Sequence, residues 1–365
     1  MGKRHSTFSG LSRFVAEAFG PTSQTTPSDL ATKTEPQHEA SQHTTKKKTR
    51  SASQLEDNDP STSAQPLQKK RKTGLLGPGY EEYDATGLVP YYTDASEVPE
   101  HLRKYFFQRE RYFSLYSSGC LLDEEGWYSV TPELIANQIA ERCRCGTILD
   151  AFCGVGGNAI AFAQTCERVI AIDTSPTRLA LARHNAVIYG VQDRIEFIQA
   201  DYLSFARSYL STASGSSQTR QRKIDVVFLS PPWGGPEYIS GNNAASDEPS
   251  SQKDDKQTHP EFSLASIQPV HGTELFTLTR KITRNVAYFL PRNTNLVEIS
   301  DLLLAEGGEG GPTSAKAKGK QKAGSPSKQE VVEVEEEWMG SKLKALTCYF
   351  GGLAAGQEEL YEQPV

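Results

Sequence analysis

A regular alternation of strand and helix patterns between residues 147 and 230 is the feature that most constrains the fold of this chain. Four apolar runs predict strands, namely TILDAF (147–152), RVIAID (168–173), RIEFIQAD (194–201) and KIDVVFLS (223–230). Helical spacing follows each of the first three, in NAIAFAQTC, SPTRLALARHNAVIYG and YLSFARSYL. This order predicts an α/β fold with a doubly wound, mostly parallel sheet.

The sequence on either side of this alternation completes a domain plan. VAYFLP (286–291) predicts one more strand, and EVVEVEEEW (330–338) with KLKALTCYFG (342–351) predicts an antiparallel hairpin at one edge of the sheet. Basic and aromatic residues alternate at helical spacing over residues 98–116. The plan has a disordered basic tail (1–75), a helical N-terminal extension (76–131), a core (132–351) with surface insertions (211–222, 241–260, 306–329), and a C-terminal tail (352–365).

The tail and the rest of the chain carry opposite charge. Residues 1–75 hold 12 basic and 7 acidic residues, a net of +5, so the remaining 27 basic and 38 acidic residues carry −11. The tail has few apolar residues, which predicts disorder. Its basic runs KKKTR (46–50) and KKRK (69–72) favour a nuclear import signal over a charged tail that is only solvated. We therefore expect a nuclear protein, in the nucleolus or Cajal bodies, with some in the cytoplasm. An acidic globular part does not coat long nucleic acid, so any polyanion contact must rest on a local cluster.

The six cysteines predict no metal site. None forms a C-x-x-C pair, no histidine lies at ligand spacing from them, and the spacing in ERCRC (141–145) is wrong for zinc. Reduced thiols in an intracellular protein are the favoured interpretation. No apolar run approaches 18 residues and the N-terminus has no apolar signal region, so we expect neither a membrane span nor a secretory signal.

The loop LDAFCGVGGNA (149–159) joins the first predicted strand to the first helix, and its glycines let the backbone approach a ligand closely. Gly154, Gly156 and Ala159 also fit a loose dinucleotide fingerprint, so an oxidoreductase is one alternative. The loop alone does not identify the ligand.

Three acidic residues favour S-adenosylmethionine over a dinucleotide. Asp150 ends the first strand, where a carboxylate would repel a pyrophosphate but suits the ammonium of an amino acid. Asp173 ends the second strand and can accept hydrogen bonds from two ribose hydroxyls, and Asp201 ends the third, where it could meet an adenine amine. Ligands of open α/β sheets bind at these carboxyl ends, although each aspartate alone also fits a helix N-cap.

The run LSPPWGGPEY (229–238) stops the fourth strand and presents Trp233 between prolines and glycines. Many methyltransferases acting on exocyclic amines of bases carry a Ser-, Asn- or Asp-Pro-Pro-aromatic run here. Ser230 and the carbonyl of Pro231 can accept the hydrogens of such an amine and so turn its lone pair toward a methyl group. Trp233 can stack on the base, and tryptophan suits a positively charged base such as 7-methylguanine. A structural tryptophan in a turn is the alternative.

Five motifs together resemble the trimethylguanosine synthase family, a group of RNA cap guanine-N2 methyltransferases. They are DAFCGVGGNAIAFA, RVIAID, SPPWGGPEY, EGWYSVTPE and YFLPRN, and the resemblance spans about residues 98–350 without the three insertions. It implies a Rossmann-like class I methyltransferase with a helical N-terminal extension. It also implies that S-adenosylmethionine methylates the N2 amine of a 7-methylguanosine RNA cap twice, on small nuclear and nucleolar RNAs.

The resemblance assigns roles to individual residues. Trp233 resembles the base-stacking platform, with Ser230 and Pro231 as the pair that positions the amine. The other implied roles are donor contacts at Asp150, Asp173, Gly154 and Gly156, closure over donor and cap by Phe113, Ser129 and Thr131, a triphosphate clamp of Lys104, Tyr238 and Arg292, and a further cap contact at Asn185.

Two alternatives stay open besides the oxidoreductase. A cap-binding or coactivator protein could retain the fold without catalysis, although the donor acids and the Ser-Pro-Pro-Trp run are intact. Another RNA or DNA amine methyltransferase is the second, and a requirement for prior 7-methylation would separate it from a cap enzyme.

The expected partners are capped small RNAs, with ribonucleoprotein partners at the tail and no membrane, and the expected state is a monomer.

Overall fold

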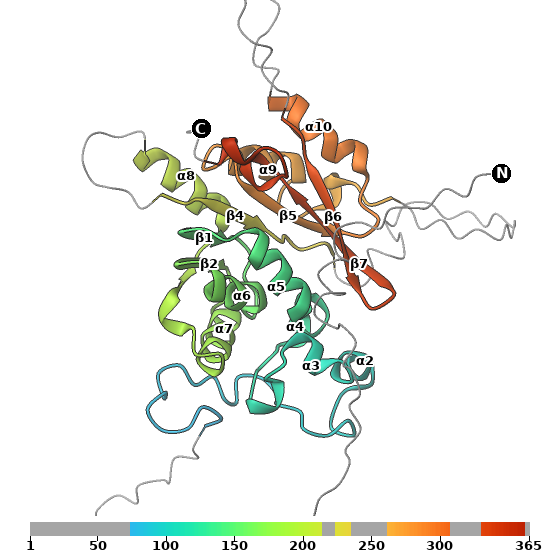
Figure 1. Cartoon of the computed structure of the whole chain (residues 1–365). Helices are drawn as coiled ribbons and strands as arrows, with labels where there is room; N and C mark the ends of the chain where they lie inside the picture. Colours follow the sequence, from blue (N-terminus) through green and yellow to red (C-terminus); the bar gives the residue numbers. More distant parts are fainter. Residues whose placement is uncertain (1–73, 214–222, 235–260, 307–329, 362–365) are drawn as a thin grey trace, which may run out of the picture. The chain divides into compact units, whose positions relative to one another are not determined.

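The computed structural model describes residues 74–213, 223–234, 261–306 and 330–361. Its centre is a seven-stranded sheet in the order β3-β2-β1-β4-β5-β7-β6 (Figure 1). The strands are β1 (Thr147–Asp150), β2 (Arg168–Asp173), β3 (Ile195–Gln199), β4 (Val226–Leu229), β5 (Val286–Pro291), β6 (Glu333–Met339) and β7 (Lys342–Tyr349). The first five pair in parallel, and β6 and β7 form the expected antiparallel hairpin at one edge.

Helices cover both faces of the sheet, which confirms the doubly wound α/β class. One face carries α5 (Glu133–Arg142), α6 (Gly157–Thr165) and α7 (Pro176–Ile188), and the other carries α8 (Tyr202–Ala213), α9 (Gly272–Arg280) and α10 (Leu296–Glu306) (Figure 1). Successive strand residues point to opposite faces, so Ile148 of β1 packs in the first core and Leu149 in the second. Near-continuous apolar strands such as RVIAID are the consequence of this two-sided burial.

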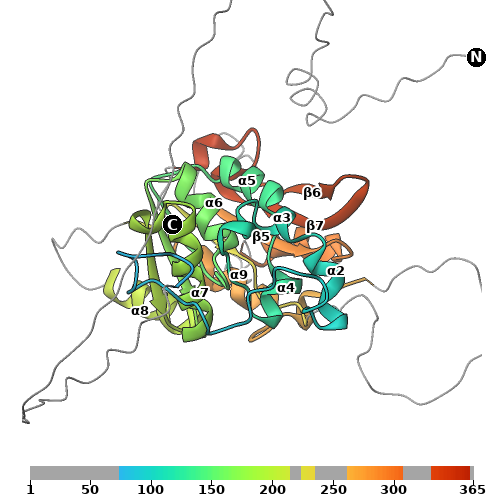
Figure 2. The same ribbon diagram turned by 90° about the horizontal axis from the view of Figure 1, so that it is seen from below.

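The N-terminal extension is a series of short helical turns around an aromatic cluster. Its elements are η1 (Glu100–Leu102), α2 (Arg103–Phe106), α3 (Arg109–Tyr112), η2 (Tyr116–Ser118) and α4 (Glu124–Ser129). The ring of Trp127 lies 6.2 Å from Phe106, 5.5 Å from Tyr116 and 6.4 Å from Tyr92, between ring centroids. Both views place α2, α3 and α4 beside the core (Figures 1 and 2).

Helix α7 is where the extension docks on the core. Asp123, at the N-cap of α4, accepts a hydrogen bond from Arg178 Nε at 3.0 Å, and Glu125 also pairs with Arg178. The buried imidazole of His184 contacts the backbone of the extension twice, at Ala85 N (3.2 Å) and Gly119 O (3.0 Å). Polar groups buried at a contact are stable when they are paired, so these bonds fix the extension in one position.

Some expected boundaries differ from the structure. The insertions at 211–222, 241–260 and 306–329 lie outside the described residues, except that residues 211–213 end α8 and residue 306 ends α10. The basic tail lies outside them too, apart from residues 74 and 75. Residues 352–361 are not a free tail, because Leu353, Ala354 and Gln357 are buried and Asn285 Nδ2 donates to Tyr361 O at 3.1 Å. In the described ranges no helix is both long and apolar enough to cross a membrane.

Candidate active site

Three strand ends meet at one edge of the sheet. β1 pairs in parallel with β2 on one side and with β4 on the other, so their carboxyl ends lie together. Asp150 is the last residue of β1, Asp173 is the last residue of β2, and Ser230 directly follows β4. The structure therefore brings together the residues that the sequence predicted for donor binding and for amine positioning.

Asp150 is a fully buried carboxyl group whose second oxygen has no hydrogen-bond partner in the structure. Its Oδ1 accepts a weak hydrogen bond from Phe152 N at 3.4 Å, while Oδ2 is buried without a partner. Burial raises the pKa of Asp150 to about 7, and the nearby charge of Asp173 adds to this rise. A buried carboxyl oxygen without a partner suits a cationic ligand, so this observation fits the ammonium group of S-adenosylmethionine.

Asp173 holds the glycine loop against β2. Its Oδ2 accepts from Gly154 N at 3.0 Å and its Oδ1 from Ser175 N at 2.8 Å. Each carboxylate oxygen has a second lone pair, which leaves two acceptors for ribose hydroxyls. Asp173 is thus suited both to shape the loop and to bind the donor.

The two loop glycines differ in what they make possible. Gly154 has φ +52°, and a Cβ built on it meets nothing within 4 Å, so the loop backbone is open on that side. Gly156 has φ +91°, and its Cβ would lie 3.0 Å from Cβ of Ala182 in α7. Gly154 therefore leaves room for a ligand, and Gly156 allows the loop to pack on α7.

Asp201 caps a helix in this structure. It lies two residues beyond β3, is exposed, and its Oδ2 accepts from both the backbone N (2.9 Å) and Oγ (2.8 Å) of Ser204. These hydrogen bonds lower the pKa of the carboxyl group, against the effect of its partial burial. The contact of Asp201 with adenine stays a prediction.

Ser230 connects the Ser-Pro-Pro-Trp run to the glycine loop. Its Oγ donates to the carbonyl oxygen of Phe152 at 3.4 Å. With its own hydrogen used in this way, the hydroxyl keeps its lone pairs as acceptors for an amine. Pro231 is buried and has no backbone N–H, so it presents a carbonyl without a competing donor.

Trp233 is half-buried and packs against β5. Its ring lies 5.2 Å from the ring of Phe289, with an interplanar angle of 35°. It also contacts both hydrophobic cores. Phe289 was not identified from the sequence, where it is one of six apolar residues in a buried strand. It orients the tryptophan that the sequence assigned to base stacking.

The extension residues lie around the start of α6. Thr131 is buried, and its Oγ1 accepts from Asn158 Nδ2 at 3.0 Å in the first turn of α6. Asn158, which the sequence did not single out, keeps a buried Oδ1 without a partner in the structure at the same place. Ser129 is exposed at the end of α4. Thr131 and Asn158 are therefore placed beside the glycine loop, as a donor lid requires.

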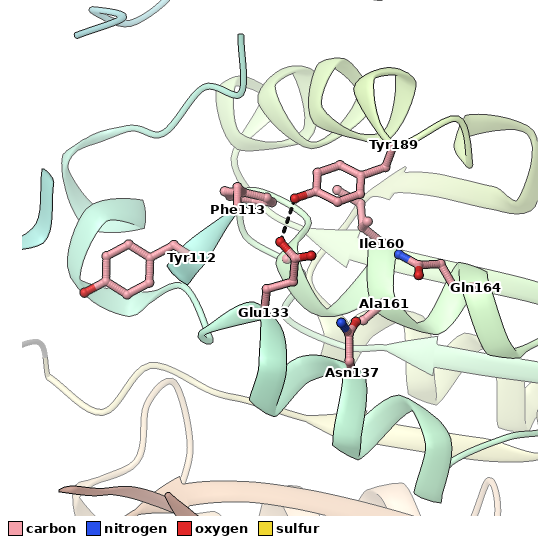
Figure 3. A pocket seen from close by; sticks show the side chains of 9 residues that line it. Tyr112, Phe113, Glu133, Asn137, Ile160, Ala161, Gln164 and Tyr189 are labelled. Atoms are coloured by element: carbon pink, nitrogen blue, oxygen red, sulfur yellow. Dashed lines mark hydrogen bonds between the residues drawn. The ribbon is translucent and has the colours of Figure 1, made fainter. Parts of the chain in front are cut away.

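Phe113 is buried beside a small cavity under the extension (Figure 3). Its ring lies 6.1 Å from Tyr189, whose hydroxyl donates to Glu133 Oε2 at 2.7 Å. The cavity, also lined by Gly157 of α6, has a volume of about 10 Å³, enough for one water molecule at most. It is too small for the donor or the cap, so the role of Phe113 in closing over the donor stays a prediction.

Asn185 is fully buried and fully bonded to the chain. Its Nδ2 donates to Leu121 O (2.9 Å) and Val155 O (3.0 Å), and its Oδ1 accepts from Leu121 N (2.8 Å). The structure therefore shows a positioning role, in which Asn185 ties the extension to the glycine loop. The direct contact with the cap that the resemblance implies stays a prediction.

The expected triphosphate clamp is only partly described. Tyr238 lies outside the described residues, and Lys104 is exposed, with its Nζ 4.8 Å from the centroid of the Tyr105 ring. Arg292 follows β5, and its Nη1 donates to Leu343 O at 3.4 Å. This contact brings it to the start of β7, where Lys344 adds a half-buried cation that the sequence did not reveal.

The cysteines lie apart from this chemistry, except for Cys153 in the glycine loop. All six are free, and the closest pair, Cys145 and Cys166, has its sulfur atoms 3.7 Å apart at the amino end of the sheet. Within the described ranges no group of three or more His, Cys, Asp and Glu side chains is placed to hold a metal ion.

Comparison with known proteins gives matches to a family model, to individual relatives and to solved structures. A family model described as RNA cap guanine-N2 methyltransferase matches residues 145–248 and 249–353. The trimethylguanosine synthase of Schizosaccharomyces pombe is 37% identical over 231 residues, which are 60% of this chain and 83% of that protein. The one of Saccharomyces cerevisiae is 33% identical over 205 residues, 54% of this chain and 57% of that protein. Among solved structures, a putative methyltransferase from Porphyromonas gingivalis W83 covers 73% of this chain and 56% of its own, with 11% identity and a TM-score of 0.41.

Proposed function

Because the chain belongs to the RNA cap guanine-N2 methyltransferase family, we propose that it converts the 7-methylguanosine cap of small RNAs to 2,2,7-trimethylguanosine with S-adenosylmethionine as methyl donor. The observation that carries this proposal is the placement of Ser-Pro-Pro-Trp. This run follows β4 and touches the glycine loop through the 3.4 Å contact of Ser230 with Phe152. Amine-orienting groups and the donor loop are thereby adjacent.

The residues around the glycine loop fit the methyl donor. Bound S-adenosylmethionine would supply an electrophilic methyl group on its sulfonium. Asp150 would pair with the ammonium group, because its buried Oδ2 is otherwise without a partner in the structure. Asp173 would accept the ribose hydroxyls, and the open side of Gly154 gives the ligand room against the backbone.

Orientation is the main catalytic contribution of the chain. The N2 amine of guanine is conjugated with the ring and is a weak nucleophile. Ser230 and the carbonyl of Pro231 would accept its two hydrogens and so direct its lone pair away from the ring. Correct orientation of reacting groups accelerates a reaction without a strong base, in keeping with a serine at this position.

Trp233 gives the proposal its specificity for the cap. Stacking of a base on an aromatic ring contributes about 1–3 kcal/mol. A guanine methylated at N7 is positively charged, and a tryptophan ring attracts a cation to its face. The packing of Trp233 on Phe289 holds the ring in one orientation for that contact.

We extend the proposal to the RNAs and to the location of the protein. The substrates are small nuclear and nucleolar RNAs, as the family resemblance implies, and the basic runs KKKTR and KKRK direct the protein to the nucleus. A fluorescent fusion of the whole chain should accumulate in nuclei. A fusion in which both runs are replaced by Ser and Gly should not.

Substrate specificity tests the proposal. Purified protein is incubated with isotopically labelled donor and with two RNAs of one sequence, one with a 7-methylguanosine cap and one with an unmethylated guanosine cap. We expect label only in the 7-methylated RNA. Label in both RNAs would favour a different amine methyltransferase, and label in neither would favour a cap-binding protein without catalysis.

A further inference from the structure

Four cations gather at the active-site edge of the sheet. They are Arg111 of α3, Arg292 after β5, and Lys342 and Lys344 of β7, here called the basic rim. No carboxylate of the described residues forms an ion pair with any of them within 4.0 Å. This differs from the other side of the molecule, where Arg142 and Arg280 are paired with glutamates.

The geometry of β5 and β7 brings the basic rim to the carboxyl edge. Pro291, the last residue of β5, pairs with Ala345 of the antiparallel β7, so the beginning of β7 lies beside the end of β5. Arg292 then reaches the carbonyl of Leu343 at 3.4 Å, between the two lysines in sequence. The same edge of the sheet carries Asp150, Asp173 and Ser230.

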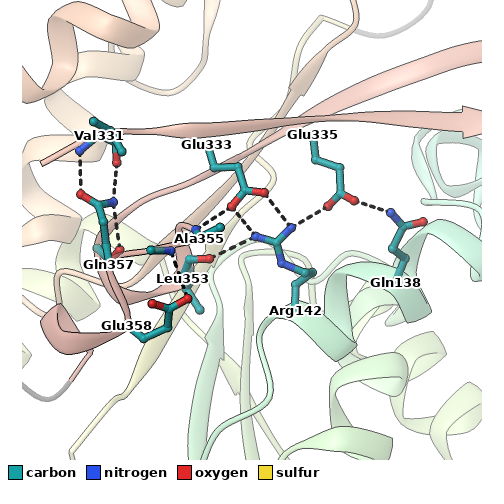
Figure 4. A network of polar contacts seen from close by, with 11 residues as sticks. Gln138, Arg142, Val331, Glu333, Glu335, Leu353, Ala355, Gln357 and Glu358 are labelled. Carbon is teal, nitrogen blue, oxygen red and sulfur yellow. Dashed lines mark hydrogen bonds and ion pairs between the residues drawn. The ribbon is translucent and has the colours of Figure 1, made fainter. Parts of the chain in front are cut away.

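The hairpin that carries the two lysines is fixed to the core. Arg142 of α5 pairs with Glu333 at 2.7 Å and with Glu335 at 3.4 Å, both on β6, and Gln138 donates to Glu335 at 2.6 Å (Figure 4). The guanidinium of Arg142 also lies 4.2 Å from the centroid of the Tyr349 ring in β7. These contacts fix the end of the hairpin away from its turn, and the pairing of Pro291 with Ala345 fixes β7 beside Arg292 at the basic rim.

Lys344 lies close enough to the other three cations of the basic rim for their charges to act on it. Burial lowers the pKa of Lys344, and the charges of Lys342, Arg111 and Arg292 lower it further. All four causes disfavour the charged form, and an anion bound among these cations would offset the repulsion between them. Arg111 and Lys342 are exposed, whereas Lys344 and Arg292 are half-buried, so an anionic ligand that contacted all four would have to be extended.

We propose that the exposed half of the basic rim, Arg111 and Lys342, binds phosphates of the first nucleotides beyond the cap, so that the enzyme holds the RNA chain as well as the cap. This inference rests on the proposed function. The half-buried Arg292 and Lys344 are left to the phosphates that join the cap to the RNA. Since the chain outside residues 1–75 has a net charge of −11, a local cation cluster of this kind is the expected way to hold RNA.

Substrate length tests this inference. The protein is assayed with a 7-methylguanosine cap dinucleotide and with a capped oligonucleotide of about ten nucleotides, a typical length for single-strand sites. We expect a higher kcat/KM for the oligonucleotide, with an advantage that decreases as salt rises. Arg111→Ala/Lys342→Ala should lose most of that advantage. The slope of log kcat/KM for the oligonucleotide against log salt should become shallower by about 1.4, since each single-strand phosphate contact contributes about 0.7.

Two matched variants control the test. Lys281→Ala removes an exposed lysine before the amino end of β5, the end away from Arg292. This variant should keep the length advantage. Lys342→Arg keeps the charge and should keep the advantage as well. Equal kcat/KM for both substrates in the wild type, or an unchanged advantage in the double variant, would overturn the inference. If the wild type methylated neither substrate, that result would instead overturn the proposed function on which the inference rests.

Discussion

The environment of Asp150 indicates most clearly which charge the ligand carries. Its pKa is raised from 3.8 to about 7 because the carboxyl is buried, so below pH 7 its neutral form dominates in the free protein. The neutral form of Asp150 is the one that the folded protein favours. The stabilisation that it contributes is fully present below about pH 4 and is lost as the pH rises through about 7. A cationic donor reverses this preference by pairing with the ionised form.

This reversal predicts a pH-dependent donor affinity. The dissociation constant of S-adenosylmethionine should rise roughly tenfold for each pH unit below about 7 and level off above it, because the donor must then displace a proton from Asp150. Calorimetry between pH 5.5 and 8.5 (about the range over which proteins are stable) measures this. Asp150→Asn should bind weakly with no such dependence. A wild-type affinity that does not change with pH would show that Asp150 does not hold the ammonium.

Trp233 gives a prediction about the base. Trp233→Ala should reduce kcat/KM for the 7-methylated cap at least tenfold, because stacking of about 1–3 kcal/mol is lost together with the orientation of the amine. Donor affinity should stay nearly the same, since the assigned donor contacts come from the ends of β1 to β3, the glycine loop and the extension, and none comes from Trp233. Trp233→Phe keeps a ring against Phe289 and should retain part of the activity. A fully active Trp233→Ala would remove the base-stacking role.

At single positions the sequence predicted placement better than it predicted partners. Asp150, Asp173 and Ser230 lie at strand ends as expected, because a strand boundary is visible in the local pattern. The partners of Asn185 are 64 and 30 residues away, at Leu121 and Val155, and no local pattern reveals them. Phe289 and Lys344 were missed for the same reason, since their neighbours are set by strand pairing across the chain.

At the scale of elements, the glycine loop depends on α7 and the extension. Asn185 in α7 bonds both Leu121 in the extension and Val155 in the loop. Asn185→Ala would leave three buried backbone groups without a partner. We expect the free energy of unfolding to fall by about 1–3 kcal/mol and the KM for the donor to rise, in denaturant titration and in steady-state kinetics.

A direct contact of Asn185 with the cap predicts a different result. If Asn185 contacts the cap directly, the Ala variant should change the KM for the cap and leave stability and donor KM as they are. Gln199→Ala removes an exposed amide at the end of β3 and serves as the control for the substitution itself.

Elements with strong local patterns were predicted well, and those without were not. The parallel strands and α6 to α8 follow from apolar runs and helical spacing. The extension was expected to be helical but is broken into short turns, because its structure is set by rings packed around Trp127 rather than by helix periodicity. Residues 352–361 were expected to be a tail, since nothing local shows that Asn285 binds the carbonyl of Tyr361.

At the scale of the whole molecule, the account predicts which parts of the chain catalysis needs. A protein beginning at residue 74 keeps every described contact and should methylate a cap dinucleotide at the wild-type rate. A protein beginning at residue 132 loses Trp127, Asp123 and the backbone groups that pair with His184 and Asn185, so it should be unstable and inactive. Thermal unfolding and cap methylation of both proteins measure this. Equal rates for the two would show that the extension is not part of the active site.

The identity of the methylated product tests the central claim most directly. The whole protein is incubated with S-adenosylmethionine and a 7-methylguanosine-capped RNA, and the cap nucleoside is released and analysed by mass spectrometry. The account predicts two successive methyl additions, both on the exocyclic N2 amine. A cap nucleoside without added methyl groups, or with a methyl group at any atom other than N2, would contradict it.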